Sequence, residues 1–220
     1  MIKCKVCGSD TISYIHPKFH TLYHECQECE FIFKDEKHYI SKKEELKKYD
    51  EHHNSLDNIG YVNYLTDFIE TAVVPFIKKG EALDFGSGPS PVLAHILKNN
   101  YKFDVDIFDL YYAIDKVYVN KSYDLITSTE VIEHLNNPLE TFELFNKHLK
   151  PNGILSIMTL FHPKNRDLFF DWHYIRDDTH VSFFTTKTLR VIAKMYDFKL
   201  IDTNDYRYAV FQKYNTTHTP

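Results

Sequence analysis

The stretch STEVIEHL, residues 128–135, places Glu130, Glu133 and His134 in an E-x-x-E-H spacing directly after the apolar run YDLIT. This run predicts a buried strand that ends near Thr127, and we expect a helix to begin at that point. Residues at i, i+3 and i+4 share one face of a helix, so the three ionisable side chains would point together. Open α/β sheets bind ligands at the carboxyl ends of their strands, which makes these three residues catalytic candidates.

Three interpretations of this trio stay open. Two carboxylates and an imidazole that converge on one point suit Mg²⁺, Mn²⁺ or Zn²⁺. Without a metal, His134 would act as a general base. The third interpretation is structural, because acidic residues in a first helical turn complement the helix dipole and Thr127 with Glu130 has capping-box spacing.

The four cysteines form two Cys-x-x-Cys pairs, at Cys4 and Cys7 and at Cys26 and Cys29. This spacing predicts a structural Zn²⁺ held by four thiolates, and the segments CKVCGSD and CQECEFIF resemble the two knuckles of a zinc ribbon. Disulfides are the first alternative and need an oxidising compartment. A redox-active pair is the second and usually precedes a helix. Because four cysteines close the site, we expect no chemistry from the ribbon itself.

A glycine turn, LDFGSGPS, follows a second apolar strand and contains Gly86 and Gly88. A dinucleotide fingerprint needs a third glycine where this chain has Pro91. A cofactor that presents a carboxylate to the turn, such as S-adenosylmethionine, is the alternative. Asp109 closes the next predicted strand about twenty residues on, where a carboxylate accepts the hydroxyls of a ribose.

The elements that must position these residues alternate between strands and helices. This alternation predicts an α/β fold with a Rossmann-like, doubly wound, mostly parallel sheet and a small N-terminal zinc ribbon. We divide the chain into the ribbon (1–35), a helical linker or lid (36–65) and a catalytic domain (66–220). The expected strands of that domain are 81–86, 102–109, 122–128, 153–161, 199–203 and 207–213, and the expected helices of the chain include 41–53, 91–100, 138–150 and 185–198.

Composition narrows the class of protein. The chain has 220 residues, 43% of them hydrophobic, and a formal net charge of −5, which gives no overall basic field for nucleic acid. The start, MIKCKVCGSD, lacks the apolar core of a secretory signal, and no apolar run reaches the roughly 20 residues of a membrane span. We therefore expect a cytoplasmic protein that does not enter a membrane.

From Thr66 onward, three motifs follow one another: a strand with a glycine turn, a strand that ends in an aspartate, and the segment YDLITSTEVIEHL. In this order they resemble a class I S-adenosylmethionine-dependent methyltransferase. The resemblance implies methyl transfer to oxygen, nitrogen or carbon. The net charge of −5 favours a small-molecule or protein acceptor over nucleic acid. The resemblance also implies ribose binding by Asp109, and further cofactor contacts by two sets of residues. Those at the methionine end are Asp84, Gly86 and Gly88, and those on the open side are Ser128, Thr129 and Glu130.

A closer resemblance includes YDEHHNS and WHYIRDDTHVSFF and is to a bacterial group of methyltransferase-like proteins that begin with a zinc ribbon. The E-x-x-E-H spacing also occurs in small-RNA 2′-O-methyltransferases and ubiquinone-pathway O-methyltransferases. This likeness implies a second divalent ion, Mg²⁺ or Mn²⁺, at Glu130, Glu133 and His134, with His180 completing the site. It favours oxygen as the acceptor atom, and without a metal His180 is a further candidate general base.

The segment FFDWHYIRDDTHVSFF follows the predicted core strand 153–161, where such folds often insert substrate-binding elements. Its substrate candidates are Trp172, His173, Tyr174 and Arg176; the alternative is that these aromatic residues pack over the sheet. In the linker, His52, His53 and Asn54 form either a lid over the cofactor or a solvated helix end.

Two rival functions remain. The chain could be a non-catalytic adaptor whose ribbon binds a partner on a degenerate methyltransferase fold, although Asp109 and the E-x-x-E-H residues argue against lost catalysis. It could also be a nicotinamide-dependent oxidoreductase, against which Pro91 counts.

Overall fold

The computed structural model describes residues 2–51 and 54–214, and within them a central sheet of six strands confirms the predicted α/β fold. The strand order is β5-β4-β6-β7-β10-β9. Neighbours from β5 to β7 pair in parallel, and β10 runs antiparallel to both of its neighbours. The strands are β4 (Glu81–Phe85), β5 (Asp104–Phe108), β6 (Tyr123–Thr129), β7 (Leu149–Met158), β9 (Phe198–Thr203) and β10 (Tyr208–Lys213).

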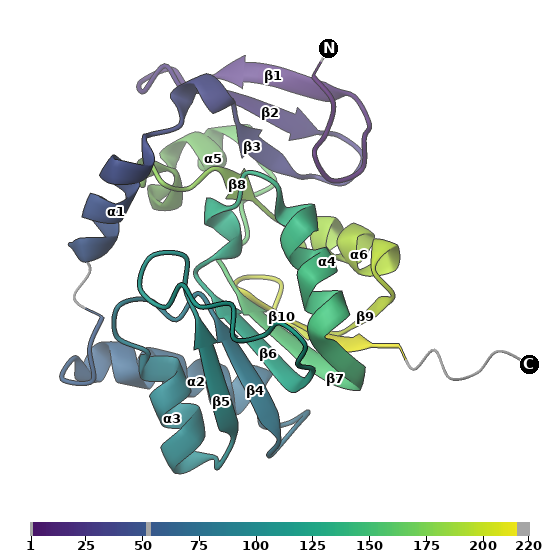
Figure 1. Cartoon of the computed structure of the whole chain (residues 1–220). Helices are drawn as coiled ribbons and strands as arrows, with labels where there is room; N and C mark the ends of the chain where they lie inside the picture. The colour runs from purple at the N-terminus through teal and green to yellow at the C-terminus, as the bar shows by residue number, and fades with distance from the viewer. Residues whose placement is uncertain (1, 52–53, 215–220) are drawn as a thin grey trace, which may run out of the picture.

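Helices cover both faces of this sheet (Figure 1). Side chains alternate along a strand, so Leu125 packs with α2 (Ile59–Ala72) and α3 (Val92–Asn100) in one core cluster. Its neighbour Ile126 belongs to the opposite cluster, with α4 (Pro138–His148) and α6 (Thr186–Met195). Burial of both strand faces explains the near-continuous apolar runs in the sequence. Thr185, the first residue of the expected helix 185–198, is the N-cap of α6.

The ribbon forms a second sheet, in which β1 (Thr11–Ile15), β2 (Leu22–Cys26) and β3 (Ile32–Lys34) run antiparallel. A fourth strand, β8 (Ser182–Phe183), extends this sheet and comes from the other end of the chain. The cysteines Cys4, Cys26 and Cys29 belong to the same core cluster as α4 and α6. The ribbon therefore shares both a sheet and a core with the rest of the protein.

The linker contains a short 3-10 turn, η1 (Glu36–His38), helix α1 (Lys42–Asp50) and the start of α2, which continues past residue 65. A capping box between Ser41 and Glu44 starts α1, and none of its described residues is buried. His52 and His53, two of the predicted lid residues, lie outside the described residues. The remaining short elements are η2 (Ile132–His134), α5 (Arg166–Asp171) and η3 (His173–Arg176).

The helix expected after Thr127 is wrong. Strand β6 continues to Thr129, and Glu130 turns the chain in a left-handed conformation with φ +53°. Only the single 3-10 turn η2 follows before Pro138 begins α4. Thr127 lies within the strand, so its capping box with Glu130 is wrong as well. A left-handed residue cannot begin an α-helix, and Glu130, Glu133 and His134 therefore do not share a helical face.

One smaller difference concerns the start of strand β7. Pro151 and Gly153 were expected to separate a helix from a strand. Strand β7 instead begins at Leu149 and includes both residues, at an irregularity in its pairing with β6.

Among the described residues, no helix combines the length and apolarity that crossing a bilayer requires.

Candidate active site

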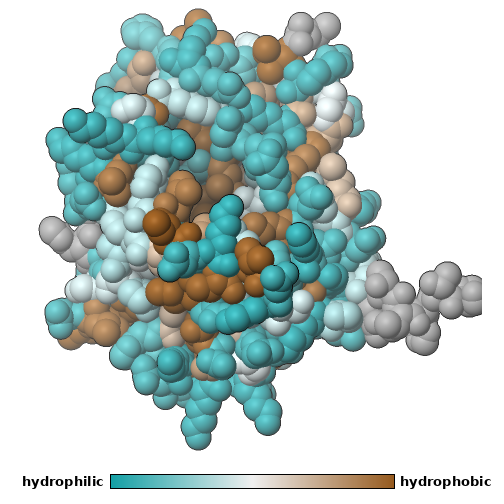
Figure 2. Space-filling view, viewed as in Figure 1, coloured by the Kyte–Doolittle hydropathy of each residue, from teal (hydrophilic) through white to brown (hydrophobic). Residues whose placement is uncertain are grey.

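A cavity of about 510 Å³ lies at the carboxyl ends of β4, β5 and β6. Its walls come from the glycine turn, the loop after β5, the loop after β6 and helix α1, with Asp177 and His180 at the far side. Figure 2 shows this face of the molecule hollowed near its middle, with hydrophobic residues gathered beside the hollow. The volume falls within the range of about 300–1,000 Å³ that is typical of small-molecule sites.

The glycine turn forms one end of the cavity. Gly86 and Gly88 have φ of +87° and +67°, which only glycine adopts readily. A Cβ on Gly86 would collide with Val131, whereas a Cβ on Gly88 would meet no atom within 4 Å. Between them, Ser87 lines the cavity, and its buried Oγ has no hydrogen-bond partner among the described residues. The turn thus leaves open backbone and an unpaired hydroxyl for a ligand.

Gly86→Ala is expected to destabilise the protein more than Gly88→Ala. Both variants force alanine into a left-handed conformation, at about 1–2 kcal/mol each. Only the alanine at 86 also crowds Val131, which adds about 1–3 kcal/mol. Urea unfolding of the two ligand-free variants measures this difference, and equal losses would contradict the predicted crowding.

Asp109 lies at the end of β5 and lines the same cavity. Its Oδ2 accepts a hydrogen bond from the Gly88 backbone N–H at 2.9 Å. Its Oδ1 accepts from the N–H groups of Tyr111 and Tyr112, at 2.8 and 3.1 Å. These bonds fix the carboxylate between the glycine turn and the next loop, where the sequence placed a ribose-binding acid.

Asp84 occupies a different environment. It is 2% exposed, does not line the cavity, and its Oδ1 accepts a hydrogen bond from Thr127 Oγ1 at 3.1 Å. Burial raises the pKa of Asp84 to about 7. Asp84 is placed to support the glycine turn from the side away from the cavity. Its predicted contact with the cofactor remains a prediction.

Asp84→Asn is expected to flatten the pH dependence of stability. The folded chain binds the Asp84 proton more tightly than the unfolded chain, whose pKa is near 3.8. The stabilisation is therefore full at acidic pH and declines as pH rises from about 4 to about 7. An amide keeps the oxygen that Thr127 bonds but does not titrate. Urea unfolding of both proteins across this window tests the effect, and parallel curves would refute it.

The open-side residues predicted for the cofactor divide into two groups. Thr129 and Glu130 line the cavity, whereas Ser128 is fully buried and does not. Glu130 accepts hydrogen bonds from the hydroxyls of Tyr64 at 2.7 Å and Tyr174 at 2.8 Å. Glu130 therefore faces the cavity with its carboxylate already oriented by two tyrosines.

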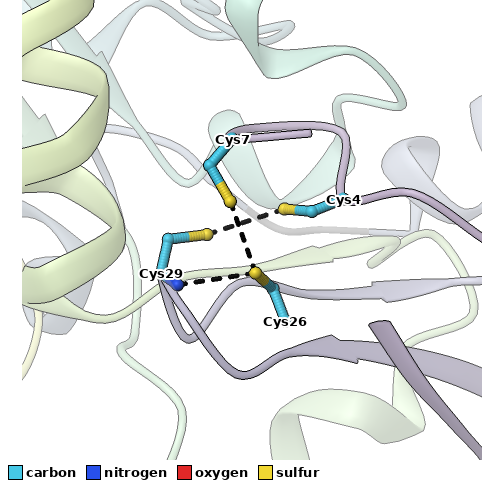
Figure 3. Close-up of side chains that lie close together, drawn as sticks. All are labelled: Cys4, Cys7, Cys26 and Cys29. Carbon is cyan, nitrogen blue, oxygen red and sulfur yellow. Dashed lines mark hydrogen bonds between the residues drawn. The ribbon is translucent and has the colours of Figure 1, made fainter. Parts of the chain in front are cut away.

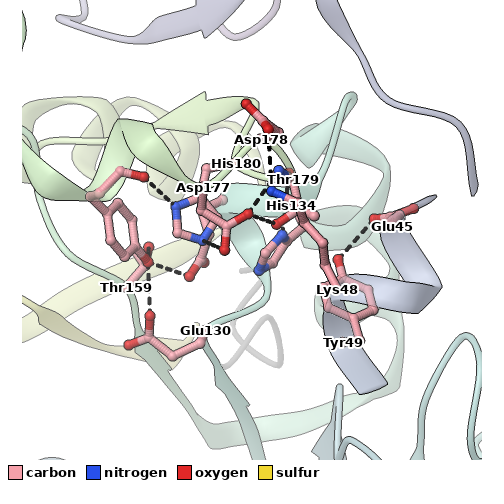
Figure 4. Close-up of polar contacts among 12 residues, drawn as sticks. Glu45, Lys48, Tyr49, Glu130, His134, Thr159, Asp177, Asp178, Thr179 and His180 are labelled. Atoms are coloured by element: carbon pink, nitrogen blue, oxygen red, sulfur yellow. Dashed lines mark hydrogen bonds and ion pairs between the residues drawn. The ribbon is translucent and has the colours of Figure 1, made fainter. Parts of the chain in front are cut away.

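Glu133, His134 and His180 converge although no helix aligns them. One ligand atom from each lies within 4.8 Å of the others. The Nδ1–H of His134 donates to the Thr179 carbonyl at 3.2 Å, and that of His180 donates to the Tyr174 carbonyl at 2.7 Å. Both imidazoles thereby keep Nε2 as the acceptor nitrogen, an arrangement common in metal-ligating histidines. Figure 4 shows His134 and His180 side by side, near Asp177.

Burial dominates the electrostatics of this group. Glu133 is fully buried, and its burial together with the nearby Glu130 raises the pKa of Glu133 well above its usual value. The Tyr174 hydroxyl also contacts Oε1 of Glu133, so its single proton is shared between Glu133 and Glu130, whereas Oε2 of Glu133 has no hydrogen-bond partner among the described residues. Burial, and secondarily His180, lowers the pKa of His134 to about 4. An unpaired carboxyl oxygen beside two imidazoles fits a divalent cation.

The four predicted substrate residues lie outside the lining of the cavity. Tyr174 is buried behind the glutamates, and Trp172 packs on it with ring centroids 4.9 Å apart. His173 and Arg176 are exposed. Their contact with an acceptor remains a prediction, and the packing of Trp172 and Tyr174 follows the structural alternative.

The sequence did not identify the wall formed by α1. Glu45 and Tyr49 line the cavity, and the Tyr111 hydroxyl donates to Glu45 at 2.6 Å. Lys48 of the same helix pairs with Asp178 at 3.2 Å (Figure 4). The expected helix 41–53 of the predicted linker or lid was the sequence signal nearest to this wall. The position of α1 suits the predicted lid, which remains a prediction.

The four cysteines lie together at the ribbon end (Figure 3). Cys4 and Cys29 Sγ are 3.6 Å apart, and Cys7 and Cys26 Sγ are 3.4 Å apart. Disulfide sulfurs would be about 2.05 Å apart. A tetrahedral zinc with bonds of about 2.3 Å places sulfurs about 3.8 Å apart, so the cluster fits the predicted Zn²⁺.

Comparison with known proteins gives one family match. A model described as a methyltransferase domain matches residues 55–203, and no curated protein matches significantly. An O-methyltransferase family protein from Burkholderia thailandensis is 13% identical, with a TM-score of 0.51, over 70% of this chain and 56% of its own. CalO1, a methyltransferase in calicheamicin biosynthesis in its SAH-bound form, is 10% identical, with a TM-score of 0.50, over 67% and 54%. The chain spans little more than half of each structure, and these likenesses show the fold.

Proposed function

This chain belongs to the methyltransferase domain family, and from that premise we propose that it is a class I S-adenosylmethionine-dependent methyltransferase acting on a hydroxyl group of a small molecule. One observation carries the proposal. A single cavity joins the glycine turn and Asp109 at one end to Glu130, His134 and His180 at the other. Donor and acceptor would therefore meet inside one cavity.

The donor end has the groups that the cofactor requires. Asp109 lines the cavity with a fixed carboxylate that can accept ribose hydroxyls, and the Gly88 backbone leaves room for close approach. Ser87 offers an unpaired hydroxyl beside them. When bound, S-adenosylmethionine supplies an electrophilic methyl group on its sulfonium and leaves as S-adenosylhomocysteine after the sulfur–carbon bond breaks.

The acceptor end supplies a base. His134 stays neutral at physiological pH because its pKa is lowered to about 4, and its Nδ1 is committed to Thr179. In the absence of a bound cation, its Nε2 can take the proton of an acceptor hydroxyl while the oxygen forms its bond to the methyl carbon. Glu133, His134 and His180 would hold a divalent cation, which would supply Lewis-acid activation of that hydroxyl.

The charges in the cavity favour a neutral or cationic acceptor. Its described lining includes four carboxylates, of Glu45, Asp109, Glu130 and Asp177, and contains no lysine or arginine. A phosphorylated acceptor or a nucleic acid would bring like charge into this space, which costs binding free energy. We therefore favour a small hydroxyl compound that is uncharged or positively charged over a protein acceptor. We also propose that the reaction takes place in the cytoplasm.

Acceptor fractions test this proposal. Small metabolites are separated by charge on ion exchangers, and release of S-adenosylhomocysteine from S-adenosylmethionine is measured with each fraction. We expect release with neutral or cationic fractions, and none when His134→Gln replaces the wild type. Release confined to the anionic fractions would overturn the acceptor class, and release with no fraction would argue for the adaptor function.

A further inference from the structure

The ribbon is connected by backbone hydrogen bonds to the acceptor end of the cavity. Strand β3 pairs with β8, with Ile32 opposite Phe183 and Phe33 opposite Ser182. Immediately before β8, the Val181 N–H donates to the Glu133 carbonyl at 2.8 Å. The same strand that completes the ribbon sheet therefore also holds the loop of the E-x-x-E-H residues.

Lys34, the last residue of β3, contacts both ends of a four-residue segment, 178–181. Its backbone N–H donates to the Val181 carbonyl at 2.9 Å. Its ammonium donates to the Asp178 carbonyl, also at 2.9 Å. The residue is 3% exposed, which is unusual for a lysine and restricts its side chain to this contact.

The clamped segment orients both histidines of the acceptor end. It contains His180 itself, and its Thr179 carbonyl accepts the Nδ1–H of His134. We propose that Lys34 of the zinc ribbon is a positioning residue, which fixes segment 178–181 so that His134 and His180 present their Nε2 atoms beside Glu133. The ribbon then completes the acceptor half of the site, a role that rests on the proposed function for its catalytic meaning.

A lysine that merely fills the space between two sheets would affect stability without affecting the histidines in particular. The matched set of variants is Lys34→Met, which keeps the backbone bond and loses the ammonium, Lys34→Arg, which keeps a donor, and Lys3→Met. Lys3 is an exposed ribbon lysine paired with Asp10, so it serves as the control. Lys34→Gln provides a polar variant if the methionine variant does not fold.

The first readout is the imidazole NMR spectrum of protein labelled at its 13 histidines. This protein keeps zinc in the ribbon and is given no other metal ion. Single His134→Gln and His180→Gln variants assign the two signals. We expect Lys34→Met to shift both signals and to leave that of His148 in place, Lys34→Arg to restore them in part, and Lys3→Met to change neither. Unchanged His134 and His180 signals in folded Lys34→Met or Lys34→Gln would overturn the proposal.

The second readout is Mn²⁺ affinity, from the spin-resonance signal of the free ion, together with zinc content and S-adenosylmethionine affinity. Loss of an outer partner bonded directly to a metal-ligating histidine typically lowers metal affinity about 10-fold to 100-fold. Lys34 acts one contact further out, through segment 178–181, so for Lys34→Met we expect the lower end, about 10-fold, at unchanged zinc content and cofactor affinity. Equal Mn²⁺ affinities would overturn the clamp. If the wild type binds no cofactor, the proposed methyltransferase function fails; if it binds no Mn²⁺, the proposed cation site fails. In either case the NMR signals of His134 and His180 still decide the role of Lys34.

Discussion

Glu133→Gln is expected to abolish Mn²⁺ binding at the acceptor end and to lower the methyl-transfer rate. An amide is uncharged and removes the only carboxylate of the trio that it forms with His134 and His180. Because loss of an outer partner already costs up to about 100-fold in metal affinity, loss of a direct ligand should exceed that. Loss of the Lewis-acid activation that the cation would supply, worth several kcal/mol, would lower the rate by a factor of about 10²–10⁴.

The same substitution should leave the fold intact. Burial already raises the pKa of Glu133, so the folded protein without metal favours the neutral form that glutamine resembles. Glu143→Gln, at an exposed position on α4, is the matched control and should retain both activities. Full Mn²⁺ affinity in Glu133→Gln would show that these side chains hold no metal, and an unchanged rate would remove Glu133 from the mechanism.

Cys26→Ser is expected to lose zinc and to destabilise the whole protein rather than the ribbon alone. Structural zinc contributes directly to folding, with apparent binding free energies of about 10–16 kcal/mol in small zinc-finger peptides. Each kcal/mol moves the Tm of a chain of this size by about 2–4 °C, so we expect the Tm to fall by more than about 10 °C.

This effect should spread because Cys26 shares a core cluster with Phe31, Phe184 and Leu189. Metal analysis and calorimetric melting measure both parts of the prediction, and Glu28→Gln, an exposed change between the two cysteines of the second pair, is the control. A variant that melts at the wild-type temperature without zinc would contradict a structural role for the metal.

The sequence predicted those parts of the molecule that depend on local patterns. Apolar runs located the strands, and the glycine turn with Asp109 located the donor end, because each requirement acts within a few residues. The same patterns misplaced the E-x-x-E-H residues on a helix. The left-handed Glu130 and the single turn after it depend on packing against distant segments, which no local pattern encodes.

Other parts of the site depend on contacts between residues far apart in the sequence. His180 was located only through a resemblance, since β8 brings it to Glu133 across more than forty residues. The cavity wall of Glu45 and Tyr49 depends on where an exposed helix comes to lie. Lys34 looks like an ordinary surface lysine in the sequence, and its burial follows from the pairing of β3 with β8.

Calorimetric titration with S-adenosylmethionine tests the central claim most directly. The account predicts that zinc-loaded wild type binds with a Kd of about 1 μM to 1 mM, the range common for enzyme ligands. Asp109→Ala should weaken binding at least about 10-fold, as expected for a lost hydrogen bond to a charged group, while Asp115→Ala, at an exposed position in the same loop, should not. A folded, zinc-loaded wild type that gives no binding heat, or an Asp109→Ala variant that binds as tightly as the wild type, would contradict the assignment of this cavity as the donor site.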